Sequence, residues 1–106
     1  MKSSSGDISH RWSLLTNHGH VLAFIAADPD ARLREIAETV GITERTAGQI
    51  VSDLEQAGYL TKIRVGRRNR YQIAANTKIA TPRLPAMTVG QMLGLLLQAL
   101  EQQPFA

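Results

Sequence analysis

The chain has 106 residues, of which 43% are hydrophobic and 20% are charged, as is typical of one globular domain and not of a disordered chain. It contains no cysteine, which excludes a disulfide framework, a thiolate metal site and a cysteine nucleophile, and which fits a reducing cytoplasm. The first residues, MKSSSGD, are polar, and the longest apolar stretch is far shorter than a membrane span. We therefore expect a cytoplasmic protein without a secretory signal or a membrane contact.

The charges are distributed unevenly along the chain. The formal net charge is +3, but residues 28–58 carry seven acidic side chains against three arginines. Residues 59–83 carry seven lysines and arginines and no acid. Such a division indicates that one face of the domain is directed at a polyanion.

The first predicted helix follows a flexible tail at residues 1–7. Its apolar side chains recur at helical spacing, at Val21, Leu22, Ile25 and Ala26. Thr16 or Asn17 is suited to cap a helix that runs to about residue 27. The sequence Asp28-Pro29-Asp30 ends this helix, because proline cannot continue the hydrogen-bond ladder.

Two further helices are predicted around a tight turn. Residues 33–40 place Ile36, Ala37 and Val40 on one face, and Gly41 stands where a left-handed C-cap is needed. Thr43 is the N-cap candidate of a longer helix, residues 44–57, which Gly58 ends. The apolar stripe of this helix consists of Ala47, Ile50, Val51 and Leu54. Two helices joined in this way form a helix-turn-helix.

Gly48 is unusual inside the second of these helices. A glycine costs about 1 kcal/mol there relative to alanine. Two explanations remain: the backbone approaches DNA or another helix closely at this position, or the glycine is a tolerated defect.

After Gly58 the apolar period becomes alternating, which predicts a β-hairpin at residues 60–74. Pairing Ile63 with Ile73 and Val65 with Tyr71 gathers these four side chains on one side of the sheet. In that register the loop is Arg67-Arg68-Asn69, with Asn69 in the left-handed conformation. The other face and the tip are then basic.

Residues 74–87 contain two prolines and are predicted to be a linker. A last helix is expected from a Thr88 cap to about residue 102, within a C-terminal segment of residues 88–106. It is apolar on more than one face, so it must bury the extra surface in its own core or against a second subunit. We expect a homodimer, with the contact made by Trp12, Val89, Met92, Leu93, Leu96, Leu97 and Leu100. In the alternative interpretation, the helix only covers its own domain.

The order of these elements is that of a winged helix-turn-helix. With TNHGHVLAFIA, then LREIAETVGITERTAGQIVSDLEQAGYL and VGRRNRYQI, the chain resembles the small bacterial winged-helix regulators of the MarR and ArsR type over about residues 14–74. The resemblance implies a mainly α fold with a small β-hairpin (α+β) and a DNA-binding domain at residues 8–73. The chain lacks the metal-sensing cysteines of many ArsR proteins and is shorter than a full MarR protein.

The same resemblance implies that the helix at residues 43–57 enters the major groove of double-stranded DNA. Its exposed residues near the N-terminus are Thr43, Arg45, Thr46 and Gln49. Arginine pairs bidentately with guanine and glutamine with adenine, which assigns base contacts to Arg45 and Gln49. The alternative is a solvated helix face.

The basic hairpin is predicted to grip the DNA. Arg67 and Arg68, at the tip, are the candidates for the minor groove. Lys62, Arg64 and Arg70 are expected to contact phosphates, as are Arg32 and Arg34 at the start of the short helix. A solvated basic surface is the alternative.

Catalysis and metal binding have little support in the sequence. His18 and His20 lie two positions apart, so on a helix their rings point to different faces and chelate poorly. We expect His18 to be partly buried and no metal or cofactor to be bound. No nucleophile elbow or Walker loop is present, so we predict no enzyme.

Together these features predict a sequence-specific transcription regulator that binds double-stranded DNA as a homodimer. A small-molecule effector is compatible with that function, although no residue set indicates one. Two alternatives remain, a winged helix that docks a protein without binding DNA, and an RNA-binding winged helix.

Overall fold

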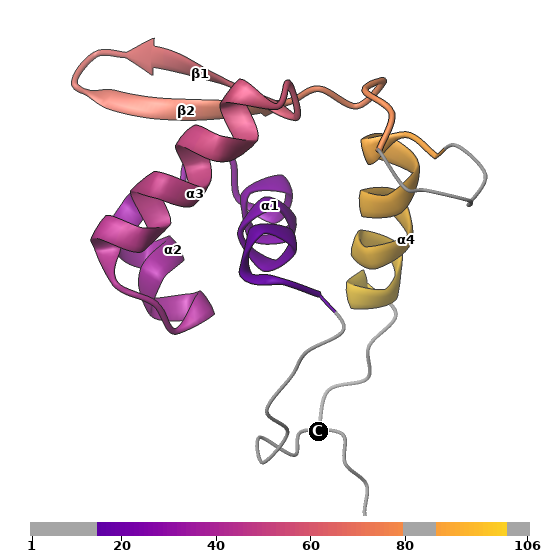
Figure 1. The fold of residues 1–106 in the computed structure, drawn as a ribbon, viewed down its shortest axis with the longest axis horizontal. Coiled ribbons are helices and arrows are strands. Elements are labelled where there is room, and N and C mark those ends of the chain that lie inside the picture. The colour runs from indigo at the N-terminus through magenta and orange to yellow at the C-terminus, as the bar shows by residue number, and fades with distance from the viewer. Residues whose placement is uncertain (1–14, 80–86, 102–106) are drawn as a thin grey trace, which may run out of the picture.

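The computed structural model describes residues 15–79 and 87–101, except for the side chains of Leu100 and Glu101. Three helices come first, α1 (Asn17–Ala27), α2 (Leu33–Val40) and α3 (Glu44–Gln56). An antiparallel hairpin of β1 (Leu60–Val65) and β2 (Arg68–Ile73) follows, and then α4 (Val89–Glu101). In Figure 1, α1 lies at the centre, with α2 and α3 on one side, α4 on the other and the hairpin across one end. The predicted tail at residues 1–7 and Trp12 lie outside the described residues.

Local hydrogen bonds and a left-handed glycine account for three ends of the first three helices. The Thr16 hydroxyl accepts from the Gly19 N–H at the start of α1, and the Thr43 hydroxyl accepts from the Thr46 N–H at the start of α3. Gly41 ends α2 with a φ of 87°, a left-handed conformation that favours glycine. The predicted helix-turn-helix is confirmed.

The core lies between these helices and the base of the hairpin. The predicted stripe of α3 is confirmed, because Ala47, Ile50, Val51 and Leu54 are all buried. Full burial of such an aliphatic side chain is worth about 1.5–3 kcal/mol, so the stripe fixes the direction in which α3 presents its other face. The remaining buried side chains come from every other element and from the loop after α1: Val21, Leu22, Ile25, Ala31, Ile36, Ala37, Leu60, Tyr71, Val89 and Leu93.

The predicted register of the hairpin is wrong by three residues. Leu60 pairs with Ile73, Lys62 with Tyr71 and Val65 with Arg68, so the turn is Gly66-Arg67 and Asn69 lies inside β2. Gly66 has a φ of 64°, as the first central residue of a primed two-residue turn requires. This turn is one residue shorter than the predicted loop and therefore sets a different register.

A shift by an odd number of residues exchanges the two faces of a strand. Tyr71 and Ile73 therefore share their face with Leu60, and not with Ile63 and Val65, which remain 40% and 53% exposed on the other side. The predicted apolar face is thus divided between the two sides of the sheet. The basic residues are divided as well, because Lys62 and Arg64 lie on the side of Tyr71, whereas Arg68 and Arg70 lie opposite.

Helix α4 packs against α1, and its first residues hydrogen-bond to the chain that follows β2. The Thr88 hydroxyl accepts from the Gln91 N–H, and the Gln91 side chain accepts from the Thr88 N–H, which is the reciprocal cap of a helix start. Gly90 donates its N–H to the Ala75 oxygen at 2.8 Å, and a Cβ at this position would lie only 2.9 Å from Ala75. Glycine is therefore needed for this close approach. Part of the predicted linker, residues 80–86, lies outside the described residues.

The described residues form four helices and one antiparallel hairpin in the order of a winged helix-turn-helix, which confirms the predicted mixed α+β fold. Among residues 15–79 and 87–101, no helix is both long and apolar enough to cross a membrane.

Candidate nucleic-acid interface

The exposed face of α3 carries the side chains that were predicted to read bases. Arg45, Thr46 and Gln49 are exposed, opposite the buried stripe. The guanidinium of Arg45 has no hydrogen bond or ion pair with any described residue. Thr43 is less free, because its hydroxyl caps the helix and also donates to the Thr46 hydroxyl at 2.9 Å. Of this set, Arg45 is the side chain best placed to meet an external partner.

Gln49 is held in place by a network that reaches α1. Its amide nitrogen donates to Asp53 Oδ1 at 3.1 Å, and the other carboxylate oxygen of Asp53 lies 2.8 Å from His18 Nε2. The hydrogen bond from His18, followed by that from Gln49, holds the pKa of the Asp53 carboxyl below its usual value. The prediction that His18 is partly buried is wrong, because its pairing with Asp53 takes place at the surface, with 47% of the His18 side chain exposed.

Ser52 is a further candidate on this face that the sequence pattern did not single out. It lies three residues after Gln49 and seven after Arg45, which puts it on the same face of α3, and it is half-buried. Helical spacing alone could have identified it. Gly48, between these residues, has an ordinary environment, because a Cβ would meet only Leu33 Cδ1 at 3.6 Å. Packing against another helix therefore does not require this glycine.

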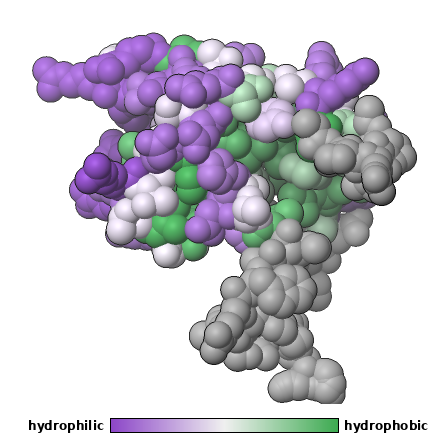
Figure 2. All heavy atoms as spheres, viewed as in Figure 1, coloured by the Kyte–Doolittle hydropathy of each residue, from purple (hydrophilic) through white to green (hydrophobic). Residues whose placement is uncertain are grey.

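The cations of the hairpin fall into two groups. Arg64 Nε donates to the Gly66 oxygen at 3.0 Å, Arg68 Nη2 donates to the Asp30 oxygen at 2.7 Å, and Arg70 Nε lies 3.4 Å from Asp30 Oδ1. Lys62 and Arg67 form no hydrogen bond or ion pair within the part of the chain that the structure describes. In Figure 2, hydrophilic residues cover the end of the molecule that carries the hairpin.

The loop between α1 and α2 fastens the hairpin to the helices. The Pro29 oxygen accepts from the Tyr71 N–H at 3.0 Å, and Asp30 holds Arg68 and Arg70 as described above. This role of Asp30 was missed, because its sequence context indicated only the end of a helix. No local pattern connects residue 30 with residues 68 and 70.

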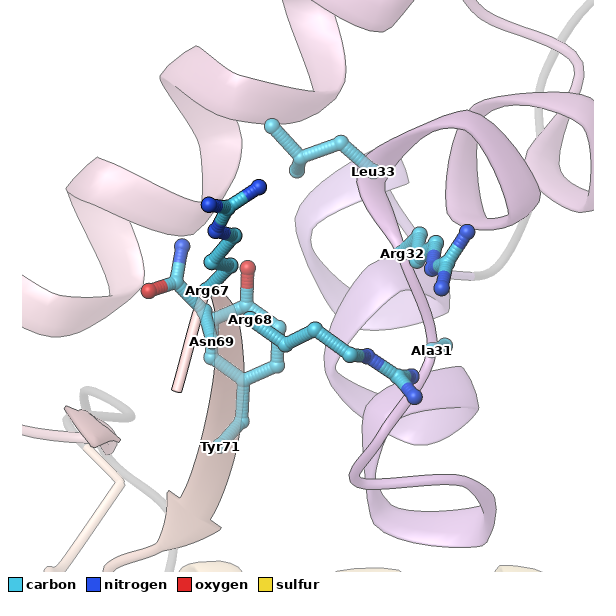
Figure 3. A pocket seen from close by; sticks show the side chains of 7 residues that line it. All are labelled: Ala31, Arg32, Leu33, Arg67, Arg68, Asn69 and Tyr71. Carbon is cyan, nitrogen blue, oxygen red and sulfur yellow. The ribbon is translucent and has the colours of Figure 1, made fainter. Parts of the chain in front are cut away.

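A pocket of about 400 Å³ lies between the hairpin and the first turn of α2. Figure 3 shows the guanidinium of Arg67 and the hydroxyl of Tyr71 directed into it, whereas Arg68 extends across to the loop before α2. Tyr71 is only 5% exposed, and no described residue hydrogen-bonds to its hydroxyl. Burial, with a smaller effect of the Glu55 charge, raises the pKa of this hydroxyl, so it is a proton donor at neutral pH.

The residues that were predicted for dimerisation lie in different environments. Val89 and Leu93 are buried in the core of this chain, and Met92 is half-buried against it. Leu96 is 37% exposed, and Leu95, which the prediction omitted, is 62% exposed. Trp12 and the side chain of Leu100 lie outside what the structure describes.

Comparison with known families bears on the whole arrangement. A model of the MarR family matches residues 12–70, more than half of the 106-residue chain, and the match includes the helix-turn-helix and most of the hairpin. Comparison with curated proteins finds no match. The helix-turn-helix, the hairpin and the extent of the match lead to one conclusion, that the chain belongs to the MarR family of winged-helix transcription regulators.

Proposed function

We propose that the protein is a sequence-specific regulator that binds double-stranded DNA as a cytoplasmic homodimer. One observation carries the proposal: α3 presents an exposed arginine without a partner among the described residues, Arg45, in the helix that a winged helix-turn-helix inserts into the major groove. The basic hairpin beside it supplies the cations that a phosphate backbone needs.

In this proposal α3 supplies the base contacts. Arg45 pairs with guanine. Gln49 gives one N–H to Asp53, but its second N–H and its carbonyl oxygen remain, and these are the two groups that adenine pairs with. The bond to Asp53 restricts the Gln49 side chain before DNA arrives, which lowers the entropy lost on binding. Ser52 and Thr46 add hydroxyls on either side.

The hairpin supplies the contacts to the backbone. Lys62 and Arg67 have no internal partner to give up within the described residues. Arg64, Arg68 and Arg70 each use one N–H internally, and a guanidinium has five, so all three keep donors for phosphates. These contacts increase affinity for any sequence and make binding sensitive to salt.

The outer side of α4 is the proposed dimer surface. Leu95 and Leu96 are exposed next to each other on a helix whose other side is already buried in the core. Exposed leucines in such a position bury their apolar area when a second copy covers them. A dimer with two-fold symmetry presents two α3 helices to successive major grooves, about 34 Å apart.

Selection of bound sites from random duplex DNA tests the function directly. We expect an inverted repeat with half-sites about one helical turn apart and binding that weakens steeply with salt. Arg45→Ala is expected to cost about 1–3 kcal/mol and to relax the base preference at one position, whereas Arg67→Ala weakens binding to all sequences alike.

The controls separate the alternatives. If Arg45→Ala and Arg67→Ala bind every DNA sequence at low salt as tightly as the wild type does, the proposed contacts are wrong. Preference for structured RNA in competition with duplex DNA would favour an RNA-binding winged helix. No binding to either nucleic acid would favour a protein-docking module.

A further inference from the structure

The pocket between the hairpin and α2 contains a tyrosine hydroxyl that is open to the pocket and has no partner among the described residues. A buried tyrosine normally finds a hydrogen-bond partner for its hydroxyl within the protein or in ordered water. Tyr71 is more than nine-tenths buried, yet no described residue bonds to its hydroxyl, which points into the pocket (Figure 3). The fold thus encloses the ring and leaves its polar atom directed at a site that a ligand can enter.

Further donors lie at this pocket, beside the amide of Asn69 and the apolar Ala31 and Leu33. Arg67 directs its guanidinium into it from the turn of the hairpin (Figure 3). The first turn of α2 forms the opposite wall, and its N-cap residue is Arg32, whose side chain has no acceptor atom. Glu35 Oε1 accepts from the Arg32 N–H at 2.9 Å and places a negative charge in this turn. The N–H groups of Leu33 and Arg34 have no side-chain cap and lie at the positive end of the helix dipole.

A neutral hydroxyl and a guanidinium face the pocket from the hairpin, and the N-terminal end of α2 lines its opposite wall. The ligand chemistry that satisfies all of them is an oxyanion with several acceptor oxygens, and helix N-termini recurrently bind phosphate. A volume of about 400 Å³ accommodates a phosphate group together with atoms attached to it.

We propose that this pocket is a phosphate-binding site, with the Tyr71 hydroxyl, the Arg67 guanidinium and the first-turn N–H groups of α2 as donors. The phosphate is either a backbone group of bound DNA, in which case the inference rests on the proposed function, or part of a free ion or small phosphorylated molecule. Tyr71 has no place in the proposed set of base and backbone contacts, so the site adds a binding residue to it.

The decisive variant is Tyr71→Phe, and its matched control is Tyr59→Phe. These are the two tyrosines of the chain, and Tyr59 does not line this pocket. Because the Tyr71 hydroxyl has no partner among the described residues, Tyr71→Phe should unfold at the same temperature as the wild type. Arg67→Gln, which changes an exposed residue of the turn, is a second variant that leaves the core untouched.

The first arm measures DNA binding. Loss of one hydrogen bond to a charged phosphate weakens binding roughly tenfold or more. We expect this loss for Tyr71→Phe with every DNA sequence and no loss for Tyr59→Phe. Duplexes that carry a single neutral methylphosphonate locate the contact, because one position should weaken the wild type and have no further effect on Tyr71→Phe.

The second arm titrates the free protein with inorganic phosphate and follows its amide signals by NMR, with sodium chloride at matched ionic strength as the control. A free-ion site shifts the Leu33 and Arg34 amides in the wild type and in Tyr59→Phe, but not in Tyr71→Phe. If phosphate produces these shifts and the wild type binds no DNA, the site is supported and the proposed function is refuted. A loss in the first arm alone identifies the DNA backbone as the phosphate source. If Tyr71→Phe binds DNA like the wild type and phosphate shifts neither amide, the site is refuted, whereas an effect of Arg45→Ala still supports DNA binding.

Discussion

Helix α3 and the hairpin belong to one candidate interface, but the fold holds them in different ways. Four side chains of α3 are buried, whereas only Leu60 and Tyr71 are buried in the hairpin. The hairpin is instead fastened by hydrogen bonds, from the Tyr71 N–H to Pro29 and from Arg68 to Asp30. Helix α3 thus owes its position to packing and the hairpin largely to polar contacts with one loop.

This difference matters for how each element can act. A helix fixed by four buried side chains presents Arg45 and Gln49 in a defined direction, which base recognition requires. The hairpin is fastened at Tyr71 and at Arg68, next to its turn, by hydrogen bonds. Contact with a phosphate backbone requires less exact placement than base recognition, because it carries no direct sequence information. In the proposed function, α3 therefore chooses the sequence and the hairpin supplies most of the affinity.

Truncation of one isoleucine in each element should change stability by the most different amounts, because one isoleucine is buried and the other is exposed. Ile50→Ala in α3 should lower the free energy of unfolding by about 2–5 kcal/mol, because it leaves a cavity in the core. Ile63→Ala in the hairpin should cost less than about 1 kcal/mol, because Ile63 is 40% exposed. Denaturation by guanidinium, followed by circular dichroism, measures both. Equal losses would show that the hairpin is packed as firmly as α3.

A smaller effect comes from one glycine in each element. Gly66→Ala should destabilise the protein by about 1–2 kcal/mol, because the residue adopts a φ of 64°. Gly48→Ala should stabilise it by up to about 1 kcal/mol, because the added Cβ makes only an ordinary contact with Leu33. Thermal unfolding of both variants checks the two signs, and a destabilised Gly48→Ala would contradict the packing described for α3.

The same Gly48→Ala variant addresses why the glycine is there. A fall in DNA affinity together with a gain in stability would show that α3 needs glycine to approach DNA closely. An unchanged affinity would show that the glycine is a tolerated defect.

The smallest effect concerns the network that restrains Gln49. The pKa of Asp53 is lower in the folded protein than its usual value of 3.8, so its carboxylate stabilises the fold above that value and loses this contribution as the pH falls below it. Wild type should therefore be more stable than Asp53→Asn at neutral pH, and the difference should shrink in acid. Unfolding curves between neutral pH and pH 3 measure it.

Glu38→Gln is the control for this pH series, because the Glu38 side chain has no hydrogen bond or ion pair with the described residues. A difference between wild type and Asp53→Asn that stays constant down to pH 3 would argue against the network.

The three helices of the helix-turn-helix follow from local sequence signals, as do the caps at Thr16, Gly41 and Thr43. Thr16, Gly41 and Thr43 act on residues at most four or five positions away, and the stripe of α3 follows from helical periodicity. Each of these signals involves only residues that are close to one another in the sequence. They also identified Arg45 and Gln49 as exposed residues of the helix that family resemblance assigns to the major groove.

The hairpin register and the long-range contacts depend on how the elements pack in three dimensions. The hairpin register depended on a turn at Gly66-Arg67, and a shift of three residues moved Ile63 and Val65 to the opposite face from Tyr71. The contact of His18 with Asp53 joins residues 35 positions apart, and that of Arg68 with Asp30 joins residues 38 apart. No periodicity connects such positions, because packing of the helices brings them together. For the same reason, the position of the Tyr71 hydroxyl in a pocket beside the first turn of α2 could not be predicted from the sequence.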